Sequence, residues 1–350
     1  MTLNLAEKIT IVFCSILALT GIVLSIIFVV KESGTASTTT YGSNDDRENF
    51  EYQHLPDFLE IVENFNDKKK KVKKKTVKKK TVKIKFWNGR LGNNIIQTLQ
   101  AVQYALKYNL DIVILPRRIF KGYQGYGKFL KGNEIYINSI IGKKNTKNVA
   151  NDTFWYSIGG AKREDLDKYA SKAVPYAKKI WSLPFSGVVV LGDDVLVMHI
   201  RGEDIFKKGW KNPNYVTPPL SYYQKIIDQG NWKQVKIISS DDTNPCLNVL
   251  VNQYNHVTWT RNTLEQDIGI LMSAKNVATS FGTFAHSLIT FSDNLEKLWQ
   301  PSQNNQFYNI KLYRPDIEIE TIDLDEYYRL QTPWEYTDEQ KERMMNYKLI

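Results

Sequence analysis

The alternation of short apolar runs with amphipathic stretches over residues 188–291 constrains the fold of this chain most strongly. β-Branched and apolar residues predict strands at 195–200, 235–239, 256–260 and 276–280. Between and after them, apolar residues at helical spacing predict helices at 219–228, 246–254, 264–275 and 283–291. Strands that alternate with helices in this way indicate a parallel sheet with helices on both of its faces.

A second α/β segment precedes this one. A strand is predicted at 82–87 and another at 111–115, and between them Ile95, Leu99, Val102 and Leu106 recur at helical spacing. Together these elements predict a βαβ unit with a glycine-containing turn. We therefore expect an α/β fold of two Rossmann-type domains, residues 83–187 and 188–300, which is the arrangement called GT-B. Residues 301–350 show no clear period and are predicted to form a C-terminal extension.

The N-terminal region has the features of a membrane anchor. Residues 9–30 carry no charge and are rich in Ile, Leu and Val. As a helix they would extend about 33 Å, enough to cross the hydrocarbon core. The weak charge difference across this segment favours a cytoplasmic tail of residues 1–8 and a lumenal body. We therefore expect a single-pass type II protein of the endoplasmic reticulum or Golgi, with a polar stem over residues 31–82.

Two further features bear on the compartment and the partners. The sequon at Asn151 predicts glycosylation, which agrees with a lumenal body. Twelve lysines lie between Lys68 and Lys85, and removing them from the formal net charge of +10 leaves −2 for the rest of the chain. We interpret this run as a solvated spacer in the stem, with contact to anionic lipid or an acidic partner as the alternative. No recognition helix or aromatic pattern accompanies it, so nucleic acid is not expected as a partner.

Ligands of open parallel sheets bind outside the carboxyl ends of the strands. This rule selects three loops of the second domain, residues 199–204, 239–243 and 279–283, and the loop 89–93 after the first strand of the other domain. In isolation, the pattern H-x-R-x-x-D of the first loop is more often a surface ion-pair cluster. Because several strand-end loops of compatible chemistry are predicted to converge, we interpret it as a functional site.

The residue types in these loops suit a pyrophosphate. The guanidinium of Arg201 can bind phosphate oxygens bidentately. Ser280 and Asn93 precede predicted helices, whose N-termini attract anions. With these groups to neutralise a leaving nucleoside diphosphate, no metal is required. Two alternatives stay open: Gly89 and Gly92 form an ordinary tight turn, and Asp241 and Asp242 cap the helix at Pro245.

The same loops resemble a known family. Residues 89–94 resemble the G-x-L-G-N-Q opening of α1,2-fucosyltransferases, and residues 199–204 resemble their H-x-R-R-G-D segment, which is related to a motif of α1,6- and protein O-fucosyltransferases. Residues 240–242 are similar to the family's S-D-D, Asp267 with residues 271–273 to D-x-x-x-L-M-S, and residues 279–281 to S-S-F. The resemblance covers residues 83–300, with the motifs in the same order.

The resemblance implies an inverting, metal-independent glycosyltransferase that transfers fucose from GDP-fucose to a glycan hydroxyl, without a cofactor. A protein O-fucosyltransferase, a transferase with another nucleotide sugar, and a non-catalytic membrane-tethered protein that binds a GDP-sugar or a polyanion are the alternatives. By the resemblance, Arg201 binds the β-phosphate, His199 holds the nucleotide or the arginine, and Asp241 or Asp242 lies near the nucleoside. The donor-binding set it implies is Gly89, Gly92, Asn93, His199, Arg201, Asp241, Asp242, Asp267, Thr279, Ser280 and Phe281.

The sequence departs from the family in two places. Gly202-Glu203 stands where the family has Arg-Gly, so a second arginine is missing and a carboxylate is gained. The Trp-Trp that follows S-S-F in the family is absent and is replaced by Gly282-Thr283-Phe284. A carboxylate can assist attack by the acceptor hydroxyl as a general base. Asp204 and Glu203 are both candidates for this role, beside Arg201 and His199 in the catalytic set.

Overall fold

The computed structural model describes residues 78–116, 129–138, 145–155, 158–183, 189–207, 214–303 and 308–349. All of them belong to one compact unit, residues 73–350. The predicted tail 1–8, the anchor 9–30 and most of the stem lie outside the described residues. Within the described ranges, no helix has the length and apolar character needed to cross a membrane.

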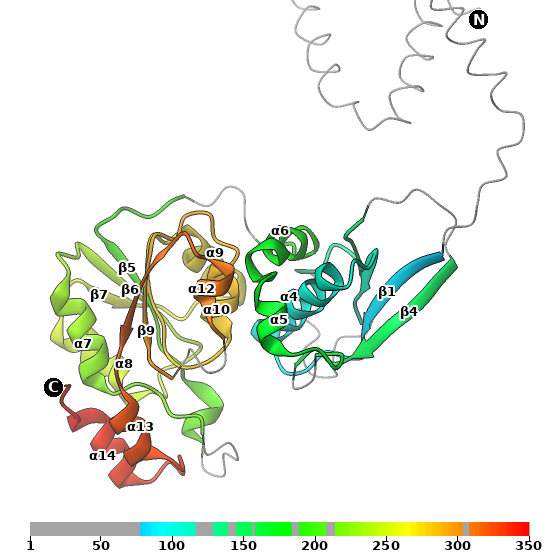
Figure 1. Cartoon of the computed structure of the whole chain (residues 1–350). Helices are drawn as coiled ribbons and strands as arrows, with labels where there is room; N and C mark the ends of the chain where they lie inside the picture. Colours follow the sequence, from blue (N-terminus) through cyan, green and yellow to red (C-terminus); the bar gives the residue numbers. More distant parts are fainter. Residues whose placement is uncertain are drawn as a thin grey trace, which may run out of the picture. The chain divides into compact units, whose positions relative to one another are not determined.

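The first half of the unit, residues 78–183, is a four-stranded sheet with helices packed against it (Figure 1). The strand order is β3-β2-β1-β4, in which β3 is antiparallel to β2 and the other pairs are parallel. The helix α4 packs on β1 and β2 and also on α5 and α6. The bounds are β1 Lys78–Ile84, α4 Leu91–Lys107, β2 Ile112–Ile114, β3 Glu134–Tyr136, β4 Asn145–Asp152, α5 Arg163–Asp167 and α6 Ala170–Ile180.

The strand β1 begins inside the lysine run, so the predicted stem boundary at residue 82 is wrong. Pairing with β4 starts at Lys78, and Lys79 is only 6% exposed. The ammonium of Lys79 lies 5.2 Å from the centre of the Tyr136 ring, a favourable cation–π contact. Backbone pairing and this contact outweigh the repulsion between neighbouring lysines, and the last lysines of the run are therefore part of the sheet.

The second half, residues 189–349, has a six-stranded sheet in which every pair is parallel, in the order β10-β9-β8-β5-β6-β7. This is the order of a classical doubly wound sheet, so the predicted α/β fold is confirmed. The bounds of its strands are β5 Val195–His199, β6 Gln234–Ile238, β7 Val257–Trp259, β8 Asn276–Ala278, β9 Lys297–Pro301 and β10 Glu318–Ile322. Those of its helices are α7 Leu220–Gln229, α8 Pro245–Gln253, α9 Leu264–Ser273, α10 Phe284–Ile289, α12 Ile310–Tyr313, α13 Asp325–Gln331 and α14 Asp338–Asn346.

Apolar side chains on the two faces of this sheet enter two separate cores. Val197 and Val277 join the core that contains α4, α9 and α10, whereas Leu196 and Met198 join the core that contains α7, α8 and α13. Every residue of β5 is buried, as expected for a central parallel strand covered on both faces.

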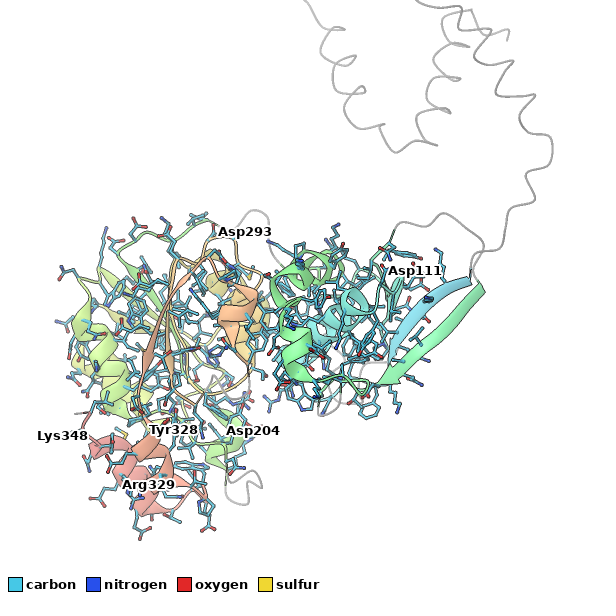
Figure 2. All side chains as sticks on the ribbon, in the orientation of Figure 1. Asp111, Asp204, Asp293, Tyr328, Arg329 and Lys348 are labelled. Carbon is cyan, nitrogen blue, oxygen red and sulfur yellow. The ribbon has the colours of Figure 1, made fainter. Side chains whose placement is uncertain are left out.

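The sheet continues beyond residue 300, so the predicted domain end there is wrong. β9 spans that boundary and β10 pairs with it in parallel. In α13, Tyr328 is buried in the second core while the neighbouring Arg329 is exposed (Figure 2). Residues 301–303 and 308–349 complete the sheet and the core of this half. Their strands are short and their apolar period is irregular, so the sequence did not indicate this.

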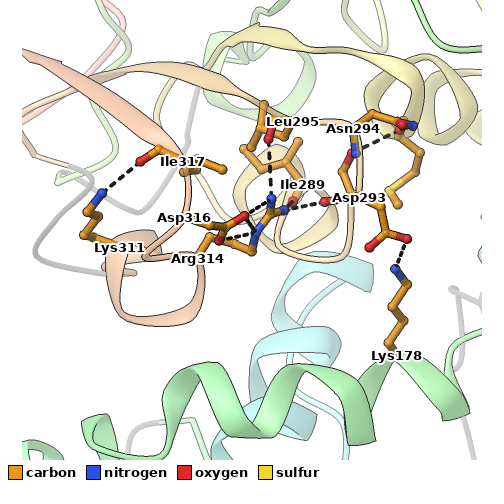
Figure 3. Close-up of polar contacts among 11 residues, drawn as sticks. Lys178, Ile289, Asp293, Asn294, Leu295, Lys311, Arg314, Asp316 and Ile317 are labelled. Atoms are coloured by element: carbon orange, nitrogen blue, oxygen red, sulfur yellow. Dashed lines mark hydrogen bonds and ion pairs between the residues drawn. The ribbon is translucent and has the colours of Figure 1, made fainter.

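Arg314 ties the last strands to the helix α10 (Figure 3). Its guanidinium donates hydrogen bonds to the carbonyl oxygens of Ile289, the last residue of α10, and of Ser292 and Leu295 beyond it. It also pairs with Asp316 at 2.7 Å. A cation at a helix C-terminus satisfies carbonyl groups that have no partner within the helix.

Candidate active site

The strand order identifies one edge of the second sheet as the place for a ligand. From β5 the chain proceeds outward through β6 and β7, and then returns to β8 on the other side of β5. The boundary between β5 and β8 is therefore a topological switch point, where ligands of open α/β sheets bind. The loops that leave these two strands carry the predicted motifs.

A cavity of about 570 Å³ lies at this edge, within the size range of small-molecule sites. Both halves of the compact unit contribute to it. Its lining comprises residues 89–93, 199–204, Tyr215, 238–240, 261, 262, 264, Asp267 and 281–284.

Two arginines and two carboxylates form an ion-pair cluster in the cavity. Arg90, from the start of α4, donates hydrogen bonds to Glu203 and to Asp204, the latter at 2.7 Å. Arg201 pairs with the other oxygen of Asp204 at 2.6 Å. The guanidinium carbon of Arg201 also lies 5.8 Å from the centre of the Tyr215 ring. Within the described part of the chain, the buried Nε of Arg201 has no hydrogen-bond partner.

Glu203 has a backbone conformation that few side chains adopt. Its φ is +59°, in the left-handed region, which costs a non-glycine residue about 1 kcal/mol. The Glu203 amide donates to Asp241 at 3.0 Å and to Thr243 at 2.8 Å, which holds this conformation. Although burial raises the pKa of Asp241, hydrogen bonds from Thr243 and the Glu203 amide bring it below its ordinary value. Asp241 therefore holds the backbone of the H-x-R-x-x-D loop at Glu203 without lining the cavity itself.

Glycine is needed at the two positions of the loop 89–93 for different physical reasons. Gly89 adopts φ +68°, a turn conformation that favours glycine. A Cβ at Gly92 would lie 2.7 Å from the backbone oxygen of Thr283. Gly92 thus permits the first turn of α4 to approach the start of α10, where Asn93 accepts a 2.5 Å hydrogen bond from Thr283. Neither a tight turn nor a ligand contact alone accounts for Gly92.

His199 connects the two strand ends at the switch point. Its Nδ1 lies 3.1 Å from the Ser280 hydroxyl, and the Ser280 amide donates to the His199 carbonyl at 3.0 Å. Burial, reinforced by the charge of Arg201, lowers the pKa of His199 to about 3, so the imidazole is neutral at physiological pH. A neutral ring in this place can position a ligand or a neighbouring group but brings no charge.

Asp267 lines the cavity from α9. The helix begins with a capping box between Thr263 and Gln266, which fixes its first turn. Asn262 donates to Asp267 at 3.0 Å, but burial dominates and raises the pKa of Asp267 to about 6. A carboxyl group with such a pKa in a cavity is a candidate for ligand contact.

The structure brings most of the predicted residues into one cavity. Those that line it are Gly89, Gly92, Asn93, His199, Arg201, Glu203, Asp204, Asp267 and Phe281. The lining does not include Asp241, Asp242, Thr279, Ser280 or Asn151. Thr279 is fully buried and bonds to His286 at 3.1 Å, whereas Asn151 is exposed on β4.

Sequence reasoning missed Arg90, Tyr215, Arg261, Asn262 and Phe284 in the lining. Arg261 follows β7, so the rule that selected the other strand-end loops could have found it. Arg90 lies within the glycine motif, in which the glycines and Asn93 carry the predicted roles. Tyr215 follows no predicted element, and no sequence signal marks it. Among the described residues, no three His, Cys, Asp or Glu side chains are grouped so as to hold a metal ion.

Comparisons with known proteins return low similarity. No protein-family model and no curated protein matches the sequence. Among solved structures, POFUT1 in complex with GDP-fucose matches 71% of this chain and 98% of its own, at 10% identity and a TM-score of 0.38. POFUT1 in complex with GDP gives 61% and 94%, 13% identity and a TM-score of 0.33. The E. coli heptosyltransferase WaaC with ADP-2-deoxy-2-fluoro heptose gives 69% and 92%, 10% identity and 0.38. These values do not assign the chain to a family.

Proposed function

We propose that this chain is an inverting, metal-independent glycosyltransferase of GT-B-like architecture that uses GDP-fucose as donor and a glycan hydroxyl as acceptor. The observation that carries the proposal is the convergence of three arginines, Arg90, Arg201 and Arg261, from three strand-end loops on one cavity at the switch point. Arginine is the side chain best suited to hold a pyrophosphate. The choice of fucose rests on the motif resemblance.

The cavity suits the other parts of the donor as well. The start of α4 presents backbone amides beside Arg90, which favours a phosphate at that end. Asp267 lies in the lining beside Asn262, and an ionised carboxylate there can accept the two N–H groups on one edge of guanine. Phe281 and Phe284 supply apolar surface for the remainder of the ligand.

The reaction is a single displacement. The acceptor oxygen attacks the anomeric carbon, the bond from that carbon to the β-phosphate oxygen breaks, and the electron pair leaves with GDP. Arg201 stabilises the charge on the departing phosphate. Because a carboxylate can accept the acceptor proton, the reaction needs no further reagent.

The anchor and the location belong to the proposal too. Residues 9–30 would tether the enzyme to the Golgi or endoplasmic reticulum membrane, with the catalytic body in the lumen and glycosylated at Asn151. Apolar character and length of the segment support the tether. The exposed position of Asn151 on β4 is compatible with a glycan.

One experiment tests donor and chemistry together. Residues 73–350 are incubated without added metal with GDP-fucose, other GDP-sugars and UDP-sugars, using free glycans and folded protein domains as acceptors. Transfer from GDP-fucose that Arg201→Ala abolishes, while the variant keeps its melting temperature, supports the proposal. Transfer from a different nucleotide sugar would show that the donor is not GDP-fucose. Binding of GDP with neither transfer nor hydrolysis would identify a binding protein instead of an enzyme.

A further inference from the structure

The charges that line the cavity balance one another. Three arginines, Arg90, Arg201 and Arg261, face three acids, Glu203, Asp204 and Asp267. Two of the arginines are already bound by carboxylates: Arg90 by Glu203 and Asp204, and Arg201 by Asp204. A pyrophosphate that binds Arg90 on the edge these carboxylates occupy, through Nη1 and Nη2, must therefore replace a carboxylate of the protein.

Glu203 and Asp204 are not equivalent in this exchange. Asp204 uses one oxygen for Arg90 and the other for Arg201, whose side chain is only 17% exposed. If Arg90 turns to a phosphate, Asp204 still has Arg201 as its partner. Among the described residues, Arg90 is the only ion-pair partner of Glu203. Glu203 is thus the carboxylate that a phosphate would set free.

The backbone of Glu203 is an independent sign that its side chain has a role. The left-handed conformation at this position favours glycine. This chain places a glutamate there and holds the conformation with hydrogen bonds from its amide to Asp241 and Thr243. Strain of this kind persists where the surroundings impose it, commonly at functional sites.

We propose that Glu203 exchanges partners during the reaction. Its carboxylate holds Arg90 until the donor pyrophosphate takes its place, and the freed carboxylate then accepts the proton of the acceptor hydroxyl as the new glycosidic bond forms. Asp204 stays on Arg201 and is a positioning residue. The inference rests on the proposed function, and it distinguishes between the two acids that the sequence left as alternatives.

The test measures binding and turnover separately. Binding of GDP and of inorganic pyrophosphate is measured by calorimetry for wild type, Glu203→Gln, Arg90→Gln and the double variant, and kcat is measured with the donor that supports transfer. Glu318→Gln is the matched control, because it removes a glutamate from an exposed ion pair with Lys297, far along the sheet. Melting temperatures confirm that each variant is folded.

Glu203→Gln removes the competitor of the phosphate, so GDP should bind about 3- to 10-fold more tightly, and this gain should vanish in the Arg90→Gln background. The same variant lacks the proton acceptor, so kcat should fall by about 100-fold or more. Glu318→Gln should change neither quantity. If Glu203 had only a structural role, its substitution would not raise the affinity for GDP and lower kcat at the same time.

The proposal requires both changes. It is overturned if Glu203→Gln binds GDP and pyrophosphate no more tightly than wild type does, or if it binds them more tightly and turns over at the wild-type rate. A wild-type protein that binds GDP but transfers no sugar refutes the proposed function, and with it the proton-accepting role. In that case the affinities of the four proteins still decide whether Glu203 competes for Arg90.

Discussion

Gly92 and Gly269 both lie in helices, but a methyl group would meet different surroundings at the two positions. At Gly92 a Cβ would lie 2.7 Å from the Thr283 carbonyl carbon and 2.8 Å from the Phe284 amide nitrogen, whereas at Gly269 no atom beyond the neighbouring residues and the backbone of its own helix lies within 4 Å. Backbone atoms cannot rotate away. The two glycines therefore form a natural pair for substitution.

We expect Gly92→Ala to destabilise the protein by about 1–3 kcal/mol, because α4 must move away from the start of α10. Gly269→Ala should stabilise it by about 0.5–1 kcal/mol through helix propensity. Urea denaturation of both variants measures the difference. Equal effects of the two substitutions would show that the close approach at Gly92 contributes nothing.

The raised pKa of Asp267 makes stability depend on pH. In the unfolded chain this carboxyl titrates near 4, and in the folded protein near 6. Between these values the native state holds the extra proton, so stability should fall as pH rises from about 4 to about 6 and the loss should be complete above that. Asp267→Asn cannot ionise. At pH 7.5 it should be about 2–3 kcal/mol more stable than wild type, with little difference at pH 4.

Denaturation at several pH values checks this prediction. A constant difference between Asp267→Asn and wild type across the range would contradict it. In the proposed enzyme the same substitution should weaken GDP binding, because an amide cannot accept both N–H groups of guanine. A variant that is more stable yet binds less tightly is the behaviour expected of a site residue.

At the scale of elements, Arg314 and Lys178 make contacts of very different value (Figure 3). The Arg314 side chain is 11% exposed and serves three carbonyl groups, whereas the partner of Lys178, Asp293, is 83% exposed. Hydrogen bonds from a charged group to buried acceptors contribute more than a solvated ion pair. We therefore expect a substitution at Arg314 to cost more stability than one at Asp293.

We expect Arg314→Ala to lower the free energy of unfolding by about 2–4 kcal/mol, because the buried carbonyls of Ile289, Ser292 and Leu295 each lose a hydrogen bond from a charged donor. Asp293→Asn, which breaks the ion pair with Lys178, should cost less than about 1 kcal/mol. Chemical denaturation of the two variants gives both values. A larger loss for Asp293→Asn would contradict this account of the segment from β9 to β10.

Elements with a clear period could be predicted from the sequence. The strand β5 and the helices α7 to α10 lie within one or two residues of their predicted ends, because apolar spacing and turn residues mark them. The antiparallel strand β3 and the strand β10 could not be predicted. Each is short, and β10 (Glu-Ile-Glu-Thr-Ile) lacks a regular apolar period, so partners distant in the sequence decide its conformation.

At the scale of the whole molecule, the sequence predicted two α/β halves and the convergence of the loops after β5 and β8. The rule for parallel sheets suffices for that. It could not predict that Arg90 crosses to the acids at Glu203 and Asp204, because such a contact depends on how the two halves pack. Nor could it predict that Asp241 accepts a hydrogen bond from the backbone of this loop and lies outside the lining of the cavity.

The C-terminal residues are predicted to be essential for folding. Trp334 donates a 2.8 Å hydrogen bond to the Ile205 carbonyl and packs edge-on against Phe206, directly after the H-x-R-x-x-D loop. A protein of residues 73–300 lacks this support together with β10, α13 and α14. It should show no cooperative thermal transition, whereas residues 73–350 should melt cooperatively. Circular dichroism monitors the thermal unfolding of both proteins. A cooperative transition in the shorter protein would contradict the prediction.

The contact between Arg90 and Glu203 also has a kinetic consequence. If the same carboxylate must leave the arginine before it can serve the incoming alcohol, the nucleotide sugar has to arrive first and the acceptor second. Spent GDP, which fits the same arginine, should then be the last product to depart and should inhibit competitively against the donor. The order in which two substrates enter would thus follow from a single glutamate that has two successive partners.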